Sequence, residues 1–217
     1  MPLLAYCMME TEAVVDKPLA GVAGTTMEEL EESGLRCLFS RFPSREHISR
    51  IPAVESALSF HQVLQVLFRQ AALISFRFPT VVENEEELQQ YLREHASRYT
   101  SELFRLRHMV QMEIHLSTPR ERGRGLPATG REYLQGRQAQ AAGLKAAAEQ
   151  FRQATRAWVR EWRERTTGEE IRCYALLDRN VVAAFQQAAR ELSIIWLGAW
   201  LSGPWPPAEF MEAIKDS

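Results

Sequence analysis

The sequence predicts an α+β fold made of two small sheets, each covered by helices. Short apolar runs bounded by turn residues are typical of strands, and two long segments with apolar residues every three or four positions are typical of helices. From residue 109 onward the expected order is strand, helix, strand, helix, strand. We divide the 217 residues into an N-terminal α+β domain (1–108) and a C-terminal α+β domain (109–217).

The N-terminal domain begins with a short apolar run. Residues 3–9 (LLAYCMM) are continuous and apolar, which predicts a buried strand. Residues 27–39 allow two interpretations. The first half of this segment favours a helix by propensity, but Ser33-Gly34 is a turn signal and the residues after it have the composition of a strand. We favour a strand hairpin here.

Helices and strands alternate in the middle of the chain. The apolar residues of 54–68 form a helical stripe. Residues 72–78 are expected to form a strand that ends at Pro79. Residues 83–106 predict a strong helix, because acidic residues in its first turn and arginines at its end complement the helix dipole. Residues 109–116 (MVQMEIHL) alternate apolar and polar side chains, which predicts a half-exposed strand.

A long helix is expected over residues 131–165, after a loop at 118–130 that is rich in glycine and proline. Its apolar residues, among them Trp158 and Trp162, keep a spacing of three or four positions, as in a coiled-coil seam. Two interpretations remain open, a core-facing helix and a protruding helical hairpin. The chain is then expected to continue with a strand at 171–177, a helix at 181–192 and a strand at 194–201.

Composition and charge restrict the class of protein. The net charge of -2 gives no general attraction to nucleic acid or to membrane surfaces. The N-terminus lacks a basic segment before its first acidic residue, so no signal peptide is expected. No apolar run approaches the roughly 18 residues that a membrane-spanning helix needs. We therefore expect a cytoplasmic protein with no nucleic acid partner and no membrane span.

No constellation of catalytic or metal-binding residues is visible. The five histidines form no HxxxH or HExxH pair, and GxSxG and GxxxxGK[ST] motifs are absent. Glu113 and His115 would share one face of a strand, but two ligands do not make a zinc site, and an exposed polar face is the simpler interpretation. Cys7, Cys37 and Cys173 lie in apolar runs, where thiols are inert packing groups. We therefore expect no catalytic residue, no cofactor and no metal, and no enzymatic activity.

Three segments carry a resemblance to a known family. They are the run from SFRFPTVV to MEIHL (75–116), GREYLQGR (130–137) and SGPWPPAEF (202–210). Together, in order and spacing, they resemble the gas vesicle protein F/L family (GvpF and GvpL), and GPWPP is the most specific of the motifs. Arg77 and Glu113 match the family pattern in the first segment. Pro79 stands where the family usually has glycine, and Ala208 where it usually has an aromatic residue.

The resemblance implies a fold and a function. It implies two α+β domains, the C-terminal one ferredoxin-like with a long helix or helical hairpin. It also implies a non-catalytic accessory or structural protein of the gas vesicle that is required for vesicle assembly. The implied partners are the small hydrophobic shell protein and other gas vesicle accessory proteins. The departures at Pro79 and Ala208 leave an alternative open, a non-enzymatic regulatory or binding module of the same fold that acts outside gas vesicle formation.

The candidate partner-binding residues are three aromatic residues and one arginine. A protein that binds an apolar shell subunit should offer an apolar surface, which indicates Trp158 and Trp162 in the long helix and Phe210 in the tail. Arg77 is added because it lies in the matched motif. We expect Trp205 to be largely buried, because a stiff proline-rich segment loses little entropy when it docks on its own fold.

Overall fold

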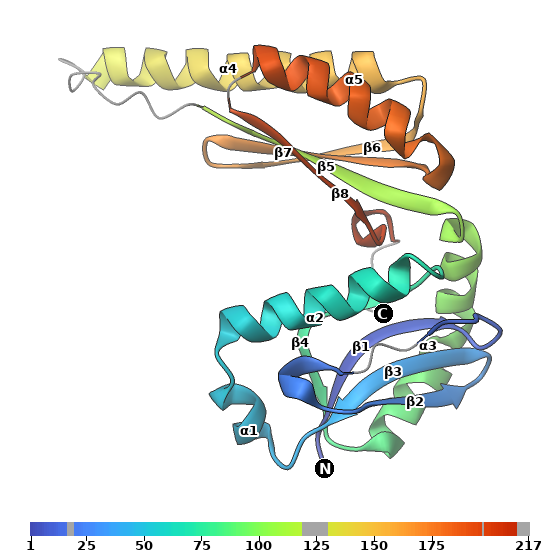
Figure 1. Ribbon diagram of the computed structural model, residues 1–217. Helices are drawn as coiled ribbons and strands as arrows, with labels where there is room; N and C mark the ends of the chain where they lie inside the picture. Colours follow the sequence, from blue (N-terminus) through green and yellow to red (C-terminus); the bar gives the residue numbers. More distant parts are fainter. Residues whose placement is uncertain (17–19, 119–129, 197, 212–217) are drawn as a thin grey trace. The chain divides into compact units, whose positions relative to one another are not determined.

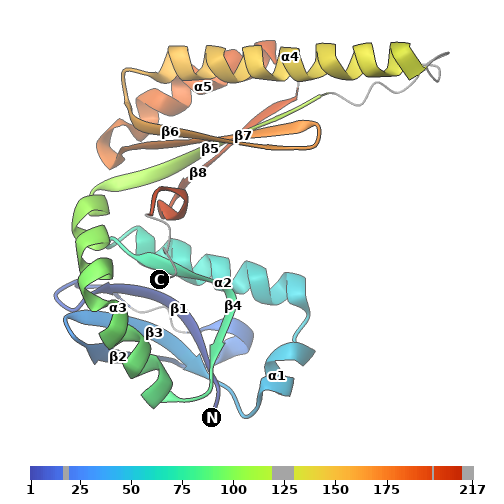
Figure 2. The same cartoon turned by 180° about the vertical axis from the view of Figure 1, so that it is seen from behind.

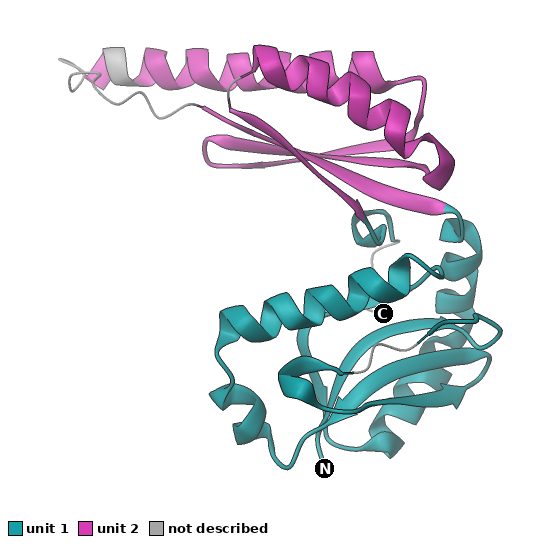
Figure 3. Cartoon of the chain, in the orientation of Figure 1, with its two compact units in different colours: residues 1–108, 205–217 teal, residues 109–204 magenta. Residues whose placement is uncertain are grey.

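The structure is a computed structural model that describes residues 1–16, 20–118, 130–196 and 198–211 (Figure 1). It contains two compact units (Figure 3). Unit 1 comprises Met1–His108 together with Trp205–Ser217, and unit 2 comprises Met109–Pro204. Unit 1 therefore resumes at Trp205, whereas the sequence analysis assigned the whole range 109–217 to the C-terminal domain.

Unit 1 is built on a four-stranded antiparallel sheet with the order β2-β3-β1-β4. Its strands are β1 (Leu3–Glu10), β2 (Met27–Glu32), β3 (Leu35–Arg41) and β4 (Ile74–Val82). Its helices are α1 (Arg45–Arg50), α2 (Ala53–Phe68) and α3 (Glu85–Leu106). Strands β2 and β3 form the expected hairpin, and its turn residues Ser33 and Gly34 have φ values of 53° and 80°. The positive φ explains why the chain uses a small residue and a glycine there.

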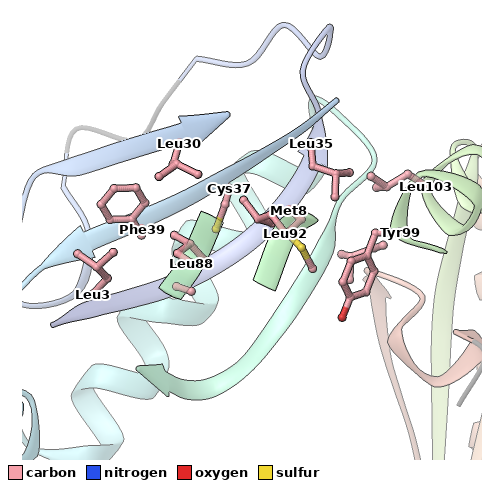
Figure 4. Packing of buried hydrophobic residues seen from close by; sticks show 12 residues of the cluster. Leu3, Met8, Leu30, Leu35, Cys37, Phe39, Leu88, Leu92, Tyr99 and Leu103 are labelled. Carbon is pink, nitrogen blue, oxygen red and sulfur yellow. The ribbon is translucent and has the colours of Figure 1, made fainter. Parts of the chain in front are cut away.

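Helices α2 and α3 cover opposite faces of this sheet (Figures 1 and 2), which explains why β1 is apolar throughout. On one face Tyr6 stacks on Phe60 of α2, with ring centroids 5.2 Å apart. On the other face Met8 packs in a cluster with α3 residues that include Leu88 and Leu92 (Figure 4). The prediction of a buried strand at residues 3–9 is confirmed.

Unit 2 is ferredoxin-like. Its strands are β5 (Met109–Ser117), β6 (Val159–Thr167), β7 (Glu170–Asp178) and β8 (Ala199–Trp205), and its helices are α4 (Gly130–Thr155) and α5 (Val182–Ile195). The element order is strand, helix, strand, strand, helix, strand, and the sheet order is β6-β7-β5-β8, as in ferredoxin-like folds. Both helices lie on one face of the sheet (Figure 1).

The expected helix over residues 131–165 is wrong in its last third. Helix α4 ends at Thr155, whose Oγ1 donates to the Phe151 carbonyl oxygen at 2.7 Å in the last turn. Strand β6 follows after a short turn and pairs with β7 along its length. Trp158 and Trp162 are four positions apart, a spacing that fits a helix stripe, but they lie in the turn and in the strand. The pairing with β7 decides the structure here, and no protruding helical hairpin forms in the described residues.

Two strand boundaries also differ from the sequence prediction. Strand β4 does not end at Pro79 but continues to Val82, and the Phe78–Pro79 peptide bond is cis. A proline is tolerated because β4 is an edge strand, where one row of N–H groups is not needed for pairing. The last strand does not begin at residue 194, because α5 continues to Ile195 and β8 begins only at Ala199.

Candidate functional site

The four residues predicted to bind a partner lie in different units. Arg77 and Phe210 belong to unit 1, and Trp158 and Trp162 belong to unit 2. Arg77 is exposed on β4 and lines a pocket of about 320 Å³. The structure therefore does not collect the four residues in one site within either unit.

Phe210 is an internal anchor of unit 1. Its side chain is 0% exposed, and its backbone carbonyl oxygen accepts a hydrogen bond from Arg105 Nη2 at 2.6 Å. Trp205 is only half-buried and packs edge-to-face on His61, with ring centroids 4.7 Å apart. The tail is docked as expected, but its buried anchor is Phe210 rather than Trp205. Phe210 is thus not available to a partner while the tail is docked.

Trp158 and Trp162 are half-buried in unit 2. Trp162 lies opposite Ala175 of β7, and its indole Nε1 donates to Glu164 Oε1 at 2.7 Å. Ala175 is fully buried and pairs with Met112, so Trp162 shares the sheet face of these core residues. Neither tryptophan is part of a helical seam.

The pair Glu113 and His115 lies on one face of β5, as the strand period requires. His115 Nε2 is 2.9 Å from Glu170 Oε2, and the Trp200 indole N–H donates to Nδ1. Glu113 Oε1 lies 3.6 Å from Arg172 Nη1. No group of three or more metal-ligating side chains occurs in the described residues. These side chains form a polar network among neighbouring strands.

The three cysteines are packing residues in this structure. Cys7, Cys37 and Cys173 are all buried, and no two of them are joined by a disulfide. Burial raises the pKa of the Cys7 and Cys37 thiols well above the usual range, and it raises the pKa of Cys173 to about 12. At neutral pH all three are therefore protonated thiols, which are poor nucleophiles.

An apolar groove in unit 2 is a surface feature of the kind that binds a hydrophobic partner. It consists of two adjoining hollows of about 310 and 360 Å³ that share Gln140 and Leu144 of α4. We call it the α4–α5 groove and define it by Leu134, Gln140, Gly143, Leu144, Ile195 and Trp196.

Exposed apolar side chains make this groove unusual. Leu134 is 60% exposed and Ile195 is 71% exposed, although both are large hydrophobic residues. Gly143 leaves open space on the α4 side of the groove, because a Cβ atom added there would meet nothing within 4 Å. At the far end β8 starts so close to β5 that a Cβ on Gly198 would lie 1.9 Å from the Ser117 carbonyl oxygen. The sequence analysis missed the groove, although the exposed Ile194-Ile195 pair at the end of α5 is a signal for it.

A family model described as gas vesicle synthesis protein GvpL/GvpF matches residues 2–212. The chain belongs to this family. The match spans both units and confirms the resemblance that the three sequence motifs carry.

Two solved structures of GvpF share the fold of this GvpL/GvpF chain. The gas vesicle protein GvpF from Anabaena sp. PCC7120 is 14% identical, with a TM-score of 0.71, and the alignment covers 98% of this chain and 96% of that one. GvpF from Microcystis aeruginosa is 13% identical, with a TM-score of 0.65, and the alignment covers 98% and 99% of the two chains. The chain matches no curated protein. In the part of the chain that the structure describes, no helix is long and apolar enough to cross a membrane.

Proposed function

We propose that this GvpL/GvpF-family protein is a non-enzymatic assembly factor that holds the small hydrophobic shell protein during gas vesicle formation. It acts in the cytoplasm, at the growing gas vesicle, together with other accessory proteins of the vesicle. The observation that carries the proposal is the α4–α5 groove, whose large apolar side chains are exposed in unit 2. Contiguous exposed apolar surface marks interaction sites in folded proteins.

The groove has the size and chemistry for an apolar segment of a partner. Residues 134 to 147 of α4 extend it over about 20 Å at 1.5 Å per residue, which matches about four turns of a docked helix. Full burial of an exposed Leu or Ile side chain contributes about 1.5–3 kcal/mol. Burial of Leu134 and Ile195 under a partner therefore contributes at most about 3–6 kcal/mol, which offsets part of the cost of association.

Two of the sequence candidates remain proposed contacts. Trp158 and Trp162 belong to the same unit as the groove and are half-buried, so each still offers part of an indole surface. Arg77 lies in unit 1 and does not line the groove. Phe210 is not retained as a contact residue, because its ring is 0% exposed.

The test is an aggregation assay on the purified shell protein. Shell protein diluted from denaturant scatters light as it aggregates, and we expect this protein to suppress the scattering with saturation near one equivalent. Suppression by a few per cent of an equivalent would indicate turnover and contradict a stoichiometric holding role. Absence of suppression at tens of micromolar would contradict shell-protein binding altogether.

A further inference from the structure

The proposed function gives no role to one pocket in unit 1. It has a volume of about 320 Å³, and β4, α3 and Met211 of the tail contribute to its lining. Phe76 and Leu88 supply apolar surface, while Arg77, Tyr91 and Tyr99 supply polar groups. Small-molecule and side-chain sites commonly combine an apolar wall with a few convergent polar groups in this way.

The two tyrosines form a hydroxyl pair. Tyr91 Oη and Tyr99 Oη are 2.5 Å apart, so one hydroxyl donates to the other. Each hydroxyl carries one proton, and the pair therefore has one O–H left to donate elsewhere. Burial and the bond to Tyr99 raise the pKa of Tyr91, so Tyr91 keeps its proton at neutral pH. Figure 4 shows the Tyr99 hydroxyl pointing away from the aliphatic side chains of the cluster.

The surroundings of this pair are positively charged. Arg77 is exposed, and among the described residues its guanidinium has no carboxylate partner. Arg98 lies over the Tyr99 ring, with its guanidinium carbon 5.6 Å from the ring centroid. No aspartate or glutamate is present in the described lining of the pocket. Among the described residues, Arg77 in the lining matches an anion better than a cation.

We propose that this pocket binds a carboxylate attached to an apolar body. The carboxylate accepts hydrogen bonds from the Arg77 guanidinium and from the free hydroxyl of the tyrosine pair, while the apolar body packs on Phe76 and Met211. Guanidinium groups suit carboxylates because their N–H groups match both oxygens. The carboxylate is either that of a free small molecule or an acidic side chain next to an apolar residue in a peptide. This site is in unit 1 and does not depend on the α4–α5 groove.

The test is a titration of the full-length protein followed by NMR. The probes are N-acetyl-phenylalanine, its amide analogue without the carboxylate, and an end-blocked peptide that contains Phe-Glu. We expect the amide signals of Ser75 and Arg77 to shift with the acid or with the peptide, but not with the amide analogue. Tighter binding of the acid would identify a free small molecule as the source of the carboxylate, and tighter binding of the peptide would identify a protein. No shift with either carboxylate, or equal shifts with the amide analogue, would overturn the proposal.

Matched variants locate the site. Arg77→Gln and the double variant Tyr91→Phe/Tyr99→Phe should each weaken carboxylate binding about tenfold, because each removes a hydrogen bond to a charged group. Both tyrosines are replaced because either hydroxyl of the pair can be the one that donates to the ligand. Arg69→Gln is the control, since Arg69 is also exposed in unit 1 but does not line the pocket. If the double variant does not fold, Arg77→Gln alone decides. Equal affinity of Arg77→Gln and Arg69→Gln would overturn the proposal, while shell-protein binding by Arg77→Gln should be unchanged.

Discussion

Arg105 Nη2 donates a 2.6 Å hydrogen bond to the backbone carbonyl oxygen of Phe210, which is 105 residues later in the chain. The same nitrogen lies 2.6 Å from Oε2 of Glu102, a carboxylate that is only 5% exposed. Helix α3 therefore holds the proline-rich tail by a charge-assisted contact next to a buried aromatic ring. The tail is a structural part of unit 1.

The buried ring predicts where the tail contributes most to stability. Phe210→Ala should lower the free energy of unfolding by about 3–5 kcal/mol, the usual cost of deleting a buried aromatic side chain. Trp205→Ala should cost clearly less, because Trp205 is only half-buried. Urea unfolding followed by circular dichroism measures both values. A larger loss for Trp205→Ala than for Phe210→Ala would show that the anchor is misassigned.

The contact between Arg105 and Glu102 predicts a measurable coupling. Arg105→Met removes the donor to Phe210 and leaves the Glu102 carboxylate without its ion-pair partner. In a double-mutant cycle with Glu102→Gln, we expect a coupling energy of about 1–3 kcal/mol, because the hydrogen bond involves charged groups. Additive effects of the two substitutions would mean that Arg105 and Glu102 do not stabilise each other.

A second polar contact in unit 1 predicts a coupled pair of substitutions. Tyr6 Oη accepts from the Val22 backbone N–H at 2.8 Å and donates to Ser40 Oγ at 3.0 Å. A Cβ atom added to Gly21 would lie 2.3 Å from Tyr6 Oη. Gly21→Ala should therefore destabilise the protein. The penalty should be smaller in the Tyr6→Phe background, because one of the two oxygens that the added Cβ would meet within 3.0 Å is absent there and only Ser40 Oγ remains. Thermal melts of the four proteins test this, and an equal penalty in both backgrounds would refute the close packing.

The pKa of Cys173 predicts how stability depends on pH. The folded-state pKa is about 12, above the value of about 8.5 for an exposed thiol, so the folded protein retains the proton longer. The stabilisation is complete below about pH 8.5 and is lost as pH rises toward the folded-state pKa. Between these values the wild type should lose about 1.4 kcal/mol per pH unit more than Cys173→Ala. Urea unfolding at pH 8 and pH 10 measures this difference, and parallel losses would contradict it.

Much of the fold could be predicted from local sequence. The continuous apolar run at residues 3–9 predicted β1 because a strand covered on both faces needs no polar side chains. Helix α3 was predicted because its start is marked by local chemistry, and Asn84 Oδ1 does accept from the Glu87 N–H at 2.9 Å.

The features that sequence reasoning missed depend on distant residues. Trp158 and Trp162 fit a helical spacing, and only the pairing of β6 with β7 places Trp162 in a strand. The sequence predicted Trp205 as the buried anchor of the tail and Phe210 as a partner contact, and only the packing of unit 1 shows that Phe210 is buried more completely than Trp205. The α4–α5 groove is lined by residues of two helices and four strands, so no single segment encodes it.

The most direct test of the proposed function is a titration of labelled shell protein with the wild type, Gly143→Leu and Gly136→Leu. Added atoms at either glycine meet open space, so both variants should fold, and each should gain up to about 1 kcal/mol of helix stability. Only Gly143 lines the groove. We expect at least about tenfold weaker binding by Gly143→Leu, as for steric blocking of a hydrophobic anchor site, and unchanged binding by Gly136→Leu. Wild-type affinity of Gly143→Leu would contradict this expectation.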